Sequence, residues 1–172
     1  RGENRIGKYR DESNWIGARG STIVNAQFVP PPPDLMRMSV GNLDFYIRES
    51  QDAPVLIQAG LAHAQFETVH PFYDGNGRIG RLLIALMLHA NKTLEKPLLY
   101  LSHYFLQNRL EYTDRLTAVR SNGDWERWMK FFLQGVQSTA DDAVARSHRI
   151  IGLRIEVIAK AGKLKHRADR VL

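Results

Sequence analysis

Residues 70–81 read HPFYDGNGRIGR and are followed at once by the apolar run LLIALML at residues 82–88. Glycines stand at positions 75, 77 and 80, and glycine lets a backbone adopt positive φ or approach a ligand closely. Successive free N–H groups in such a turn form an anion-binding concavity, and a helix N-terminus adds unpaired N–H groups of its own. The pattern predicts a loop that receives a polyphosphate and leads into a buried helix.

The polar side chains of this stretch suit the same ligand. Arg78 and Arg81 are three residues apart, so they share a helix face, and guanidinium groups bind phosphate oxygens in bidentate fashion. Asp74 is a hard oxygen ligand of the kind that Mg²⁺ takes alongside substrate phosphates. His70 accepts a proton near neutral pH, and Asn76 is expected to cap the helix or to bond a phosphate oxygen. Each of these residues alone can be explained by a structural role. No structural requirement, however, places a base, an acid, glycines and arginines together at these spacings.

The stretch resembles the signature of the Fic family (filamentation induced by cyclic AMP), His-Pro-Phe-x-Asp-Gly-Asn-Gly-Arg-x-x-Arg, at every fixed position. Further segments resemble other parts of the family, namely residues 7–17, 28–33, 62–67 and 123–128. The resemblance extends over most of the chain, from about residue 7 to about residue 160. It implies an all-α, Fic-type helical bundle with one small β-hairpin flap.

The resemblance also implies an activity. A family member of this kind is a protein adenylyltransferase, which moves AMP from ATP to a Tyr, Thr or Ser hydroxyl of a target protein and releases pyrophosphate. His70 would be the catalytic base and Asp74 the Mg²⁺ ligand. Residues of the loop and of the first helical turn would bind the nucleotide: Gly75, Asn76, Gly77, Arg78 and Arg81.

Two parts of the site are less well defined by the sequence. Tyr104, Asn108 and Tyr112 lie four residues apart on one expected helix, whose aromatic face would stack on a purine, and core packing explains them nearly as well. Tyr112 is the residue that we carry forward as a nucleotide-binding candidate. By the resemblance, the flap would hold the target segment by strand addition through Ser21, Thr22 and Ile23, and the alternative is a flap that acts only as a lid.

Other activities and partners stay open. The same site would serve removal of AMP or transfer of another phosphate-containing group, and a basic helical module that binds nucleic acid is an alternative of another class. The intact set of loop residues argues against nucleic acid as the partner. Many family members carry an inhibitory helix with the pattern Ser/Thr-x-x-x-Glu-Gly/Asn, and this sequence does not show it. An inhibitory helix elsewhere, an antitoxin partner and a homodimer therefore all remain open.

Composition agrees with one globular domain. The chain has 172 residues, of which 44% are hydrophobic and 24% charged, and these are ordinary values for a folded domain. It contains no cysteine, which fits a reducing compartment, and we expect a cytoplasmic protein without a membrane span. We expect a single domain over residues 1–172 with its core at about 7–160, cut from a longer chain because it begins at Arg1. The net charge is +6, and its late basic residues favour a solvated helix face over a nucleic-acid surface.

The hydrophobic pattern predicts one β segment and several helices. Residues 21–29 contain β-branched residues with partial alternation and are expected to form a small hairpin. Helices are expected over residues 35–49 with Asp34 as N-cap, over 54–69 with Pro54 at the first position, and over 76–90 as a central, buried helix. Residues 102–120 indicate another helix, either continuous or broken, and residues 124–161 indicate either one long helix or two joined at a glycine.

Overall fold

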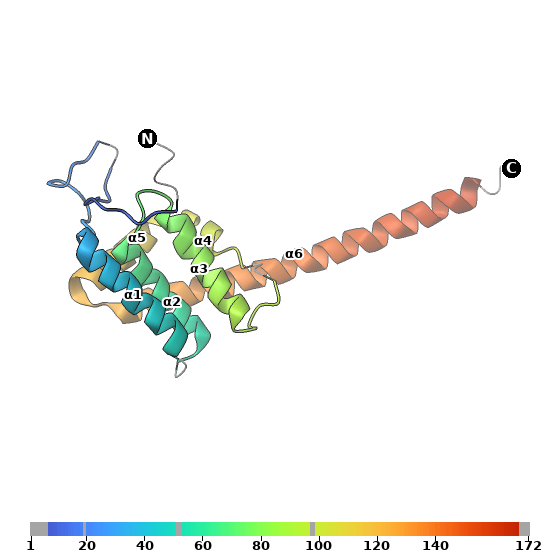
Figure 1. Cartoon of the computed structure of the whole chain (residues 1–172). Helices are drawn as coiled ribbons and strands as arrows, with labels where there is room; N and C mark the ends of the chain where they lie inside the picture. Colours follow the sequence, from blue (N-terminus) through green and yellow to red (C-terminus); the bar gives the residue numbers. More distant parts are fainter. Residues whose placement is uncertain (1–6, 19, 51–52, 97–98, 169–172) are drawn as a thin grey trace.

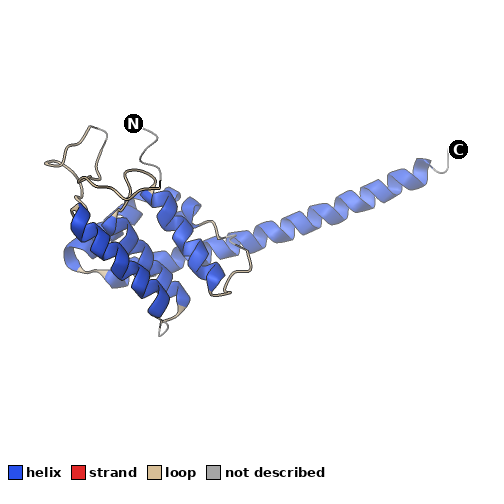
Figure 2. Ribbon diagram, in the orientation of Figure 1, coloured by secondary structure: helices blue, strands red, loops and turns tan. Residues whose placement is uncertain are grey.

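A bundle of α-helices makes up the body of the molecule, seen in a computed structural model that describes residues 7–18, 20–50, 53–96 and 99–168 (Figures 1 and 2). The described residues form six helices: α1 Pro33–Glu49, α2 Val55–Val69, α3 Asn76–Ala90, α4 Leu101–Gln107, α5 Arg109–Asn122 and α6 Trp125–Ala168. Figure 1 shows α6 leaving the bundle and continuing well beyond it. The all-α class expected from the sequence is confirmed.

Helix α2 is the centre of the bundle, because it packs against α1, α3, α5 and α6. Small residues line it, and Ala59, Gly60, Ala62 and Ala64 are all buried. Neighbouring helices can therefore lie close to its backbone. The expectation that residues 76–90 form the central helix is wrong, although its bounds are confirmed.

The first turns of α6 supply the aromatic part of the core. Trp128, Phe131 and Phe132 are buried there, and the Trp128 indole Nε1–H donates to the Gly60 carbonyl oxygen at 2.9 Å. A buried indole needs such a partner, because an unmet N–H would cost the desolvation of that group. This hydrogen bond fixes the register between α6 and α2.

Most helix boundaries follow local chemistry. Helix α1 begins at Pro33 with Pro32 as its N-cap, so Asp34 lies in the first turn, where its charge favours the helix N-terminus. Pro54 precedes α2 as its N-cap. Of the two forms left open for residues 102–120, the structure has the broken one: Asn108 separates α4 from α5 and donates through Nδ2 to the Tyr104 carbonyl at 2.9 Å.

The hairpin predicted for residues 21–29 is reduced to a single antiparallel bridge in the described part of the chain. Ile16 and Phe28 exchange two backbone hydrogen bonds, of 2.8 and 3.1 Å. Asn25 Oδ1 accepts from the Thr22 amide at 2.6 Å, and this kind of side-chain bond stabilises a turn in competition with a strand. Val24 is 91% exposed, so no packing opposes the turn.

Helix α6 settles the question left open for residues 124–161, because Trp125–Ala168 is one continuous helix. Its distal part exposes the basic residues Arg146, Arg149, Arg154 and Lys160, together with isoleucines at 150, 151, 155 and 158. None of the described helices combines the length and the apolar character that a membrane crossing requires.

The close contact of α2 with α6 yields a stability prediction. A Cβ at Gly60 would lie 2.9 Å from Phe132 Cδ1 and 3.0 Å from Met129 Cε, whereas one at Gly41 of α1 would meet nothing within 4 Å. We expect Gly60→Ala to lower the free energy of unfolding by about 1–3 kcal/mol through overpacking. The control Gly41→Ala should raise it by roughly 0.5–1 kcal/mol, because alanine favours an open helix position. Urea unfolding followed by circular dichroism measures both, and equal effects would contradict this packing.

Candidate active site

The loop that joins α2 to α3 begins with a strained histidine. His70 follows the last residue of α2 as its C-cap and has φ 49° and ψ 60°, in the left-handed region. Its amide N–H still donates to the Phe66 carbonyl at 2.9 Å. Left-handed backbone is costly for a residue other than glycine and persists where its surroundings impose it. The backbone that carries the imidazole is therefore fixed by the end of the buried helix α2.

Asn76 holds the loop closed. Its Nδ2 donates to the Phe72 carbonyl at 2.7 Å, and its Oδ1 accepts from the Phe72 amide at 2.9 Å. The residue is 2% exposed. The side-chain amide, which the sequence suggested as a cap or a phosphate ligand, is therefore engaged with the loop backbone. The backbone N–H of Asn76 remains at the first turn of the helix.

The N-terminus of α3 presents the anion-binding geometry expected of this loop. Gly75 is the N-cap, with φ 81°, which glycine adopts without strain. The first backbone bond of the helix runs from the Ile79 amide to the Gly75 carbonyl at 3.0 Å. The amides of Asn76, Gly77 and Arg78 precede it and have no intrahelical acceptor, as in the first turn of any helix. Such N–H groups, together with the helix dipole, bind phosphate.

Asp74 and Arg78 stand in solvent at the mouth of this turn. Asp74 Oδ1 accepts from the Gly75 amide at 2.7 Å, and its Oδ2 lies 3.6 Å from Arg78 Nη2. The two side chains are 93% and 76% exposed, and exposed ion pairs hold their partners weakly. Both groups are free to turn toward a ligand at little cost.

Arg81 lies deeper along the same face. Its Nε donates to Ser102 Oγ at 3.0 Å, and its Nη1 lies 3.1 Å from the point that a Cβ at Gly77 would occupy. A Cβ at position 77 would make this guanidinium shift by a few tenths of an ångström. The second motif arginine is thus held over the first turn of α3 and anchored to α4.

A carboxylate that sequence reasoning did not assign to the site lies beneath this turn. Glu67 is 6% exposed, and its Oε1 has no hydrogen-bond partner among the described residues. A Cβ at Gly80 would approach this oxygen to 2.7 Å. Burial raises the pKa of Glu67 to about 6, and the charges of Arg81 and Arg120 limit the rise. The sequence offered one signal for this placement: Glu67 stands three residues before His70, in the last turn of α2.

The environment of His70 keeps its imidazole neutral. Burial lowers the pKa of His70 to about 4, the Glu67 backbone opposes this, and the positive charges of Arg120 and Arg10 lower it further. The Nδ1 atom is buried. At neutral pH the ring is an unprotonated base, which is the form that accepts a proton from a substrate.

Tyr112 lies among the core aromatics. Its ring stacks on Phe105 with centroids 4.8 Å apart, and its hydroxyl lies 3.0 Å from His63 Nε2. His63 is fully buried and stacks on Trp128, as expected of a structural histidine. The nucleotide role of Tyr112 stays a prediction, since the described contacts are those of a core residue.

The flap residues do not meet the loop through any hydrogen bond described for them. The Ser21 carbonyl accepts from Trp15 Nε1 at 2.8 Å, and Thr22 bonds within its own turn. Residues that precede the flap contact the loop instead, since Asn14 Nδ2 donates to the Phe72 carbonyl at 3.3 Å. The target-binding role of Ser21, Thr22 and Ile23 stays a prediction.

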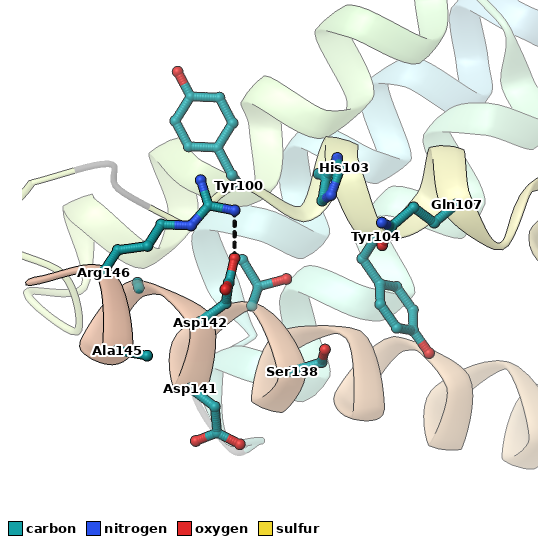
Figure 3. Close-up of a pocket in the computed structure, with 11 residues that line it drawn as sticks. Tyr100, His103, Tyr104, Gln107, Ser138, Asp141, Asp142, Ala145 and Arg146 are labelled. Atoms are coloured by element: carbon teal, nitrogen blue, oxygen red, sulfur yellow. Dashed lines mark ion pairs between the residues drawn. The ribbon is translucent and has the colours of Figure 1, made fainter. Parts of the chain in front are cut away.

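A cavity of about 770 Å³ lies elsewhere, between α4 and α6 (Figure 3). Tyr104 lines it, with its ring against Gly135, and Arg146 forms an ion pair of 2.6 Å with Asp142 at its edge. None of its lining residues belongs to the loop of residues 70–81. The loop chemistry therefore does not take place in this cavity.

The sequence and this geometry match a known family. The model of the Fic/DOC family matches residues 1–88, half of the chain. The chain belongs to the Fic/DOC family. A crystal structure of a Fic family protein from Desulfovibrio desulfuricans G20 is similar, with a TM-score of 0.70 and 27% identity, over 83% of this chain and 42% of that chain.

Curated relatives of this Fic protein are named as adenylyltransferases. A probable protein adenylyltransferase of Aquifex aeolicus (strain VF5) is 36% identical over 72 residues, which cover 42% of this chain and 22% of the relative. The protein adenylyltransferase Fic of Aedes aegypti is 29% identical over 139 residues, which cover 78% of this chain and 24% of the relative. The chain thus spans about a quarter of the length of these two relatives.

The buried histidines make the stability of the domain sensitive to acid. The pKa values of His63 and His70 are lowered by burial to about 4 from an ordinary 6.5. The unfolded chain therefore binds more protons at these residues between those values, and the free energy of unfolding should fall as the pH drops from about 6.5 toward 4. Glu67 has the opposite effect, because its folded pKa of about 6 lies above its ordinary 4.5 and the folded chain binds more protons there. The two histidines outweigh this single carboxyl group.

His63→Gln isolates one of these groups, because glutamine can still bond Tyr112 but does not titrate. We expect the variant to reduce the slope of unfolding free energy against pH by up to about 1.4 kcal/mol per pH unit between pH 5 and 6. Urea unfolding at a series of pH values measures the slope. The control His148→Gln, on the exposed part of α6, should leave it unchanged. The same slope in His63→Gln and wild type would rule out the buried neutral state.

Proposed function

We propose that this protein transfers AMP from ATP to a hydroxyl side chain of a target protein. The observation that carries the proposal is the buried His70 imidazole at the end of α2, whose lowered pKa keeps it neutral, directly before the first turn of α3 with its unpaired backbone N–H groups. The names of the curated relatives support the same activity. Because the chain spans only part of those proteins, the activity, the substrates and the partners are all part of the proposal.

The reaction joins the target oxygen to the α-phosphorus of ATP. The hydroxyl proton passes to His70, and because Nδ1 is buried we assign the transfer to Nε2. The bond between the α-phosphorus and the oxygen that bridges to the β-phosphate breaks, and pyrophosphate leaves. The products are the AMP-modified side chain, pyrophosphate and a proton on His70 that returns to solvent.

The first turn of α3 binds the phosphates in this scheme. The backbone amides of Asn76, Gly77 and Arg78 point along the helix axis toward the anion, and N–H donors fixed in advance stabilise charge as it develops on the leaving group. The Arg78 and Arg81 guanidinium groups neutralise the outer phosphates. Asn76 contributes through its backbone, since its side chain holds the loop.

The donor set fits Mg²⁺ shared with the nucleotide. The described residues contain no group of three or more metal-binding side chains, and Mg²⁺ commonly uses one or two carboxylates together with substrate phosphates and water. The exposed Asp74 carboxylate supplies such a ligand at the mouth of the phosphate turn. When bound, the ion would neutralise phosphate charge and orient the leaving group.

The flap is proposed as the place where the target segment binds. Ile23 is exposed, and the described hydrogen bonds of Ser21 and Thr22 lie within the flap segment itself, to Trp15, Ala18 and Asn25. A bound strand could pair with this backbone if the turn at residues 22–25 opened.

Incubation with α-³²P-labelled ATP, Mg²⁺ and a cell lysate tests the activity. Transfer of AMP is supported if a protein band carries the label and phosphodiesterase then releases that label as AMP. Label from γ-labelled but not α-labelled ATP would indicate transfer of a different phosphate group. Loss of label from a protein modified beforehand would indicate removal of AMP.

The role of His70 is tested by His70→Asn, because asparagine tolerates the left-handed backbone of this position but is not a base. We expect the transfer rate to fall by about 10²–10⁴-fold, the usual contribution of a general base. The dissociation constant of ATP, measured by calorimetry, should stay within about threefold of wild type, less than 1 kcal/mol. The control His148→Asn should retain full activity, and parallel losses of binding and rate in His70→Asn would remove the support for a base.

The metal role of Asp74 is tested by Asp74→Asn. We expect the ATP affinity of this variant to be insensitive to Mg²⁺, because the only carboxylate of the loop has lost its charge. Calorimetric titrations with EDTA and with saturating Mg²⁺ compare it with wild type. The control Asp44→Asn removes a similar exposed carboxylate, which pairs with Arg48 four residues later, and should keep the wild-type response. A normal Mg²⁺ response in Asp74→Asn would show that the metal ligand lies elsewhere.

A further inference from the structure

Arg10 is the only arginine among the described residues that is fully buried, at 0% exposed. A charged side chain is almost never buried unless its hydrogen-bonding groups are satisfied. Arg10 comes from the N-terminal segment, sixty positions before the loop that forms the candidate active site. Its partners therefore show what the burial of this charge achieves.

The described partners of the Arg10 guanidinium are main-chain carbonyl oxygens. Nε donates to His70 at 2.9 Å, Nη1 donates to Glu12 at 3.2 Å, and Nη2 donates to Val69 at 3.3 Å and to Pro31. One planar fork thus joins the end of α2 to the segment that leads from the flap into α1. Arginine suits this role because its donors lie in a rigid plane.

The backbone of Arg10 extends the same contact. Its amide N–H donates to the Pro71 carbonyl at 2.9 Å, so the carbonyls of Val69, His70 and Pro71 all accept from this one residue. The last carbonyls of a helix have no intrahelical donor, and a cation there also favours the helix dipole. Arg10 therefore acts as a C-terminal cap of α2 supplied from a distant part of the chain.

This cap fixes the backbone on both sides of the proposed base. The His70 amide is held by the Phe66 carbonyl, and the His70 carbonyl is held by Arg10. When both flanking peptide planes are fixed, the direction of the Cα–Cβ bond follows, and this limits the positions that the ring can reach through its side-chain rotamers. The left-handed conformation of His70 needs such support, because few residues adopt it unaided.

We propose that Arg10 is a positioning residue, which sets the direction of the His70 imidazole by holding the three consecutive carbonyls at the end of α2. The inference rests on the proposed base role of His70. Arg10 also acts through its charge. The charged groups that lower the pKa of His70, after burial, are Arg120 from α5 and Arg10 from the N-terminal segment.

Two substitutions separate geometry from charge. Arg10→Lys keeps the charge but loses the fork, and Arg10→Met loses both. We expect kcat to fall by about 10²-fold in each, the effect of a misplacement of roughly 1 Å, while KM for ATP changes by less than about threefold. The acid limb of the pH–rate profile should move to higher pH in Arg10→Met alone. The control Arg37→Met changes an exposed arginine of α1 and should behave as wild type.

Two outcomes of the kinetic experiment would overturn the proposal. One is a kcat in Arg10→Lys within about threefold of wild type, because the fork would then be dispensable. The other is a loss of rate that equals the loss of folded protein measured by thermal unfolding, because Arg10 would then serve stability alone. A loss of kcat in the folded variants, with KM for ATP preserved, supports positioning.

Measurements by NMR keep the proposal testable if a variant fails to fold or if no transfer is seen. In the wild-type protein the Arg10 Nε–H should exchange with solvent at least about 10²-fold more slowly than the exposed Arg37 Nε–H, as a buried bonded group does. His70 should show a single χ1 rotamer in its three-bond couplings, and averaged couplings in Arg10→Lys. Fast exchange at Arg10, or unchanged couplings in the variant, would overturn the proposal. Absence of transfer by the wild type would instead count against the proposed function.

Discussion

The contact between α2 and α6 is the constraint on which the rest of the structure depends. Small residues on α2, above all Gly60, let the aromatic start of α6 come within van der Waals distance of its backbone, and the Trp128 indole bonds the Gly60 carbonyl. Close packing of this kind makes α2 a rigid axis. Because His70 is the C-cap of that axis, the position of the proposed base is set by the core.

The site combines buried groups whose pKa values are shifted with exposed charged groups. Burial lowers the pKa of His70 to about 4 and raises that of Glu67 to about 6, whereas Asp74 and Arg78 are largely in solvent. Groups of the first kind need a fixed environment, and groups of the second kind can turn toward a nucleotide at little cost. The division suits a site that keeps its base ready and adapts its charged ligands to substrate.

The sequence alone determined the parts that depend on local chemistry. The bounds of the helix at Asn76–Ala90 followed from the loop glycines and the apolar run, and they are found as expected. The all-α class also followed from local patterns, whereas the break at Asn108 was left open by the sequence and located by the structure. The residue types of the loop indicated the Fic family, because a base, an acid, glycines and arginines at fixed offsets carry chemical information even without a fold.

Only the tertiary structure decided which groups meet across the chain. The sequence left the Asn76 side chain open between a cap and a phosphate ligand, and Tyr112 open between a purine and the core; the structure shows the first bonded to the Phe72 backbone and the second packed among aromatic side chains. The hairpin is reduced to the bridge between Ile16 and Phe28, and the Asn25 side chain closes a turn at residues 22–25. The link from Arg10 to His70 spans sixty residues, and no local propensity or periodicity reports which distant carbonyls a buried guanidinium will satisfy.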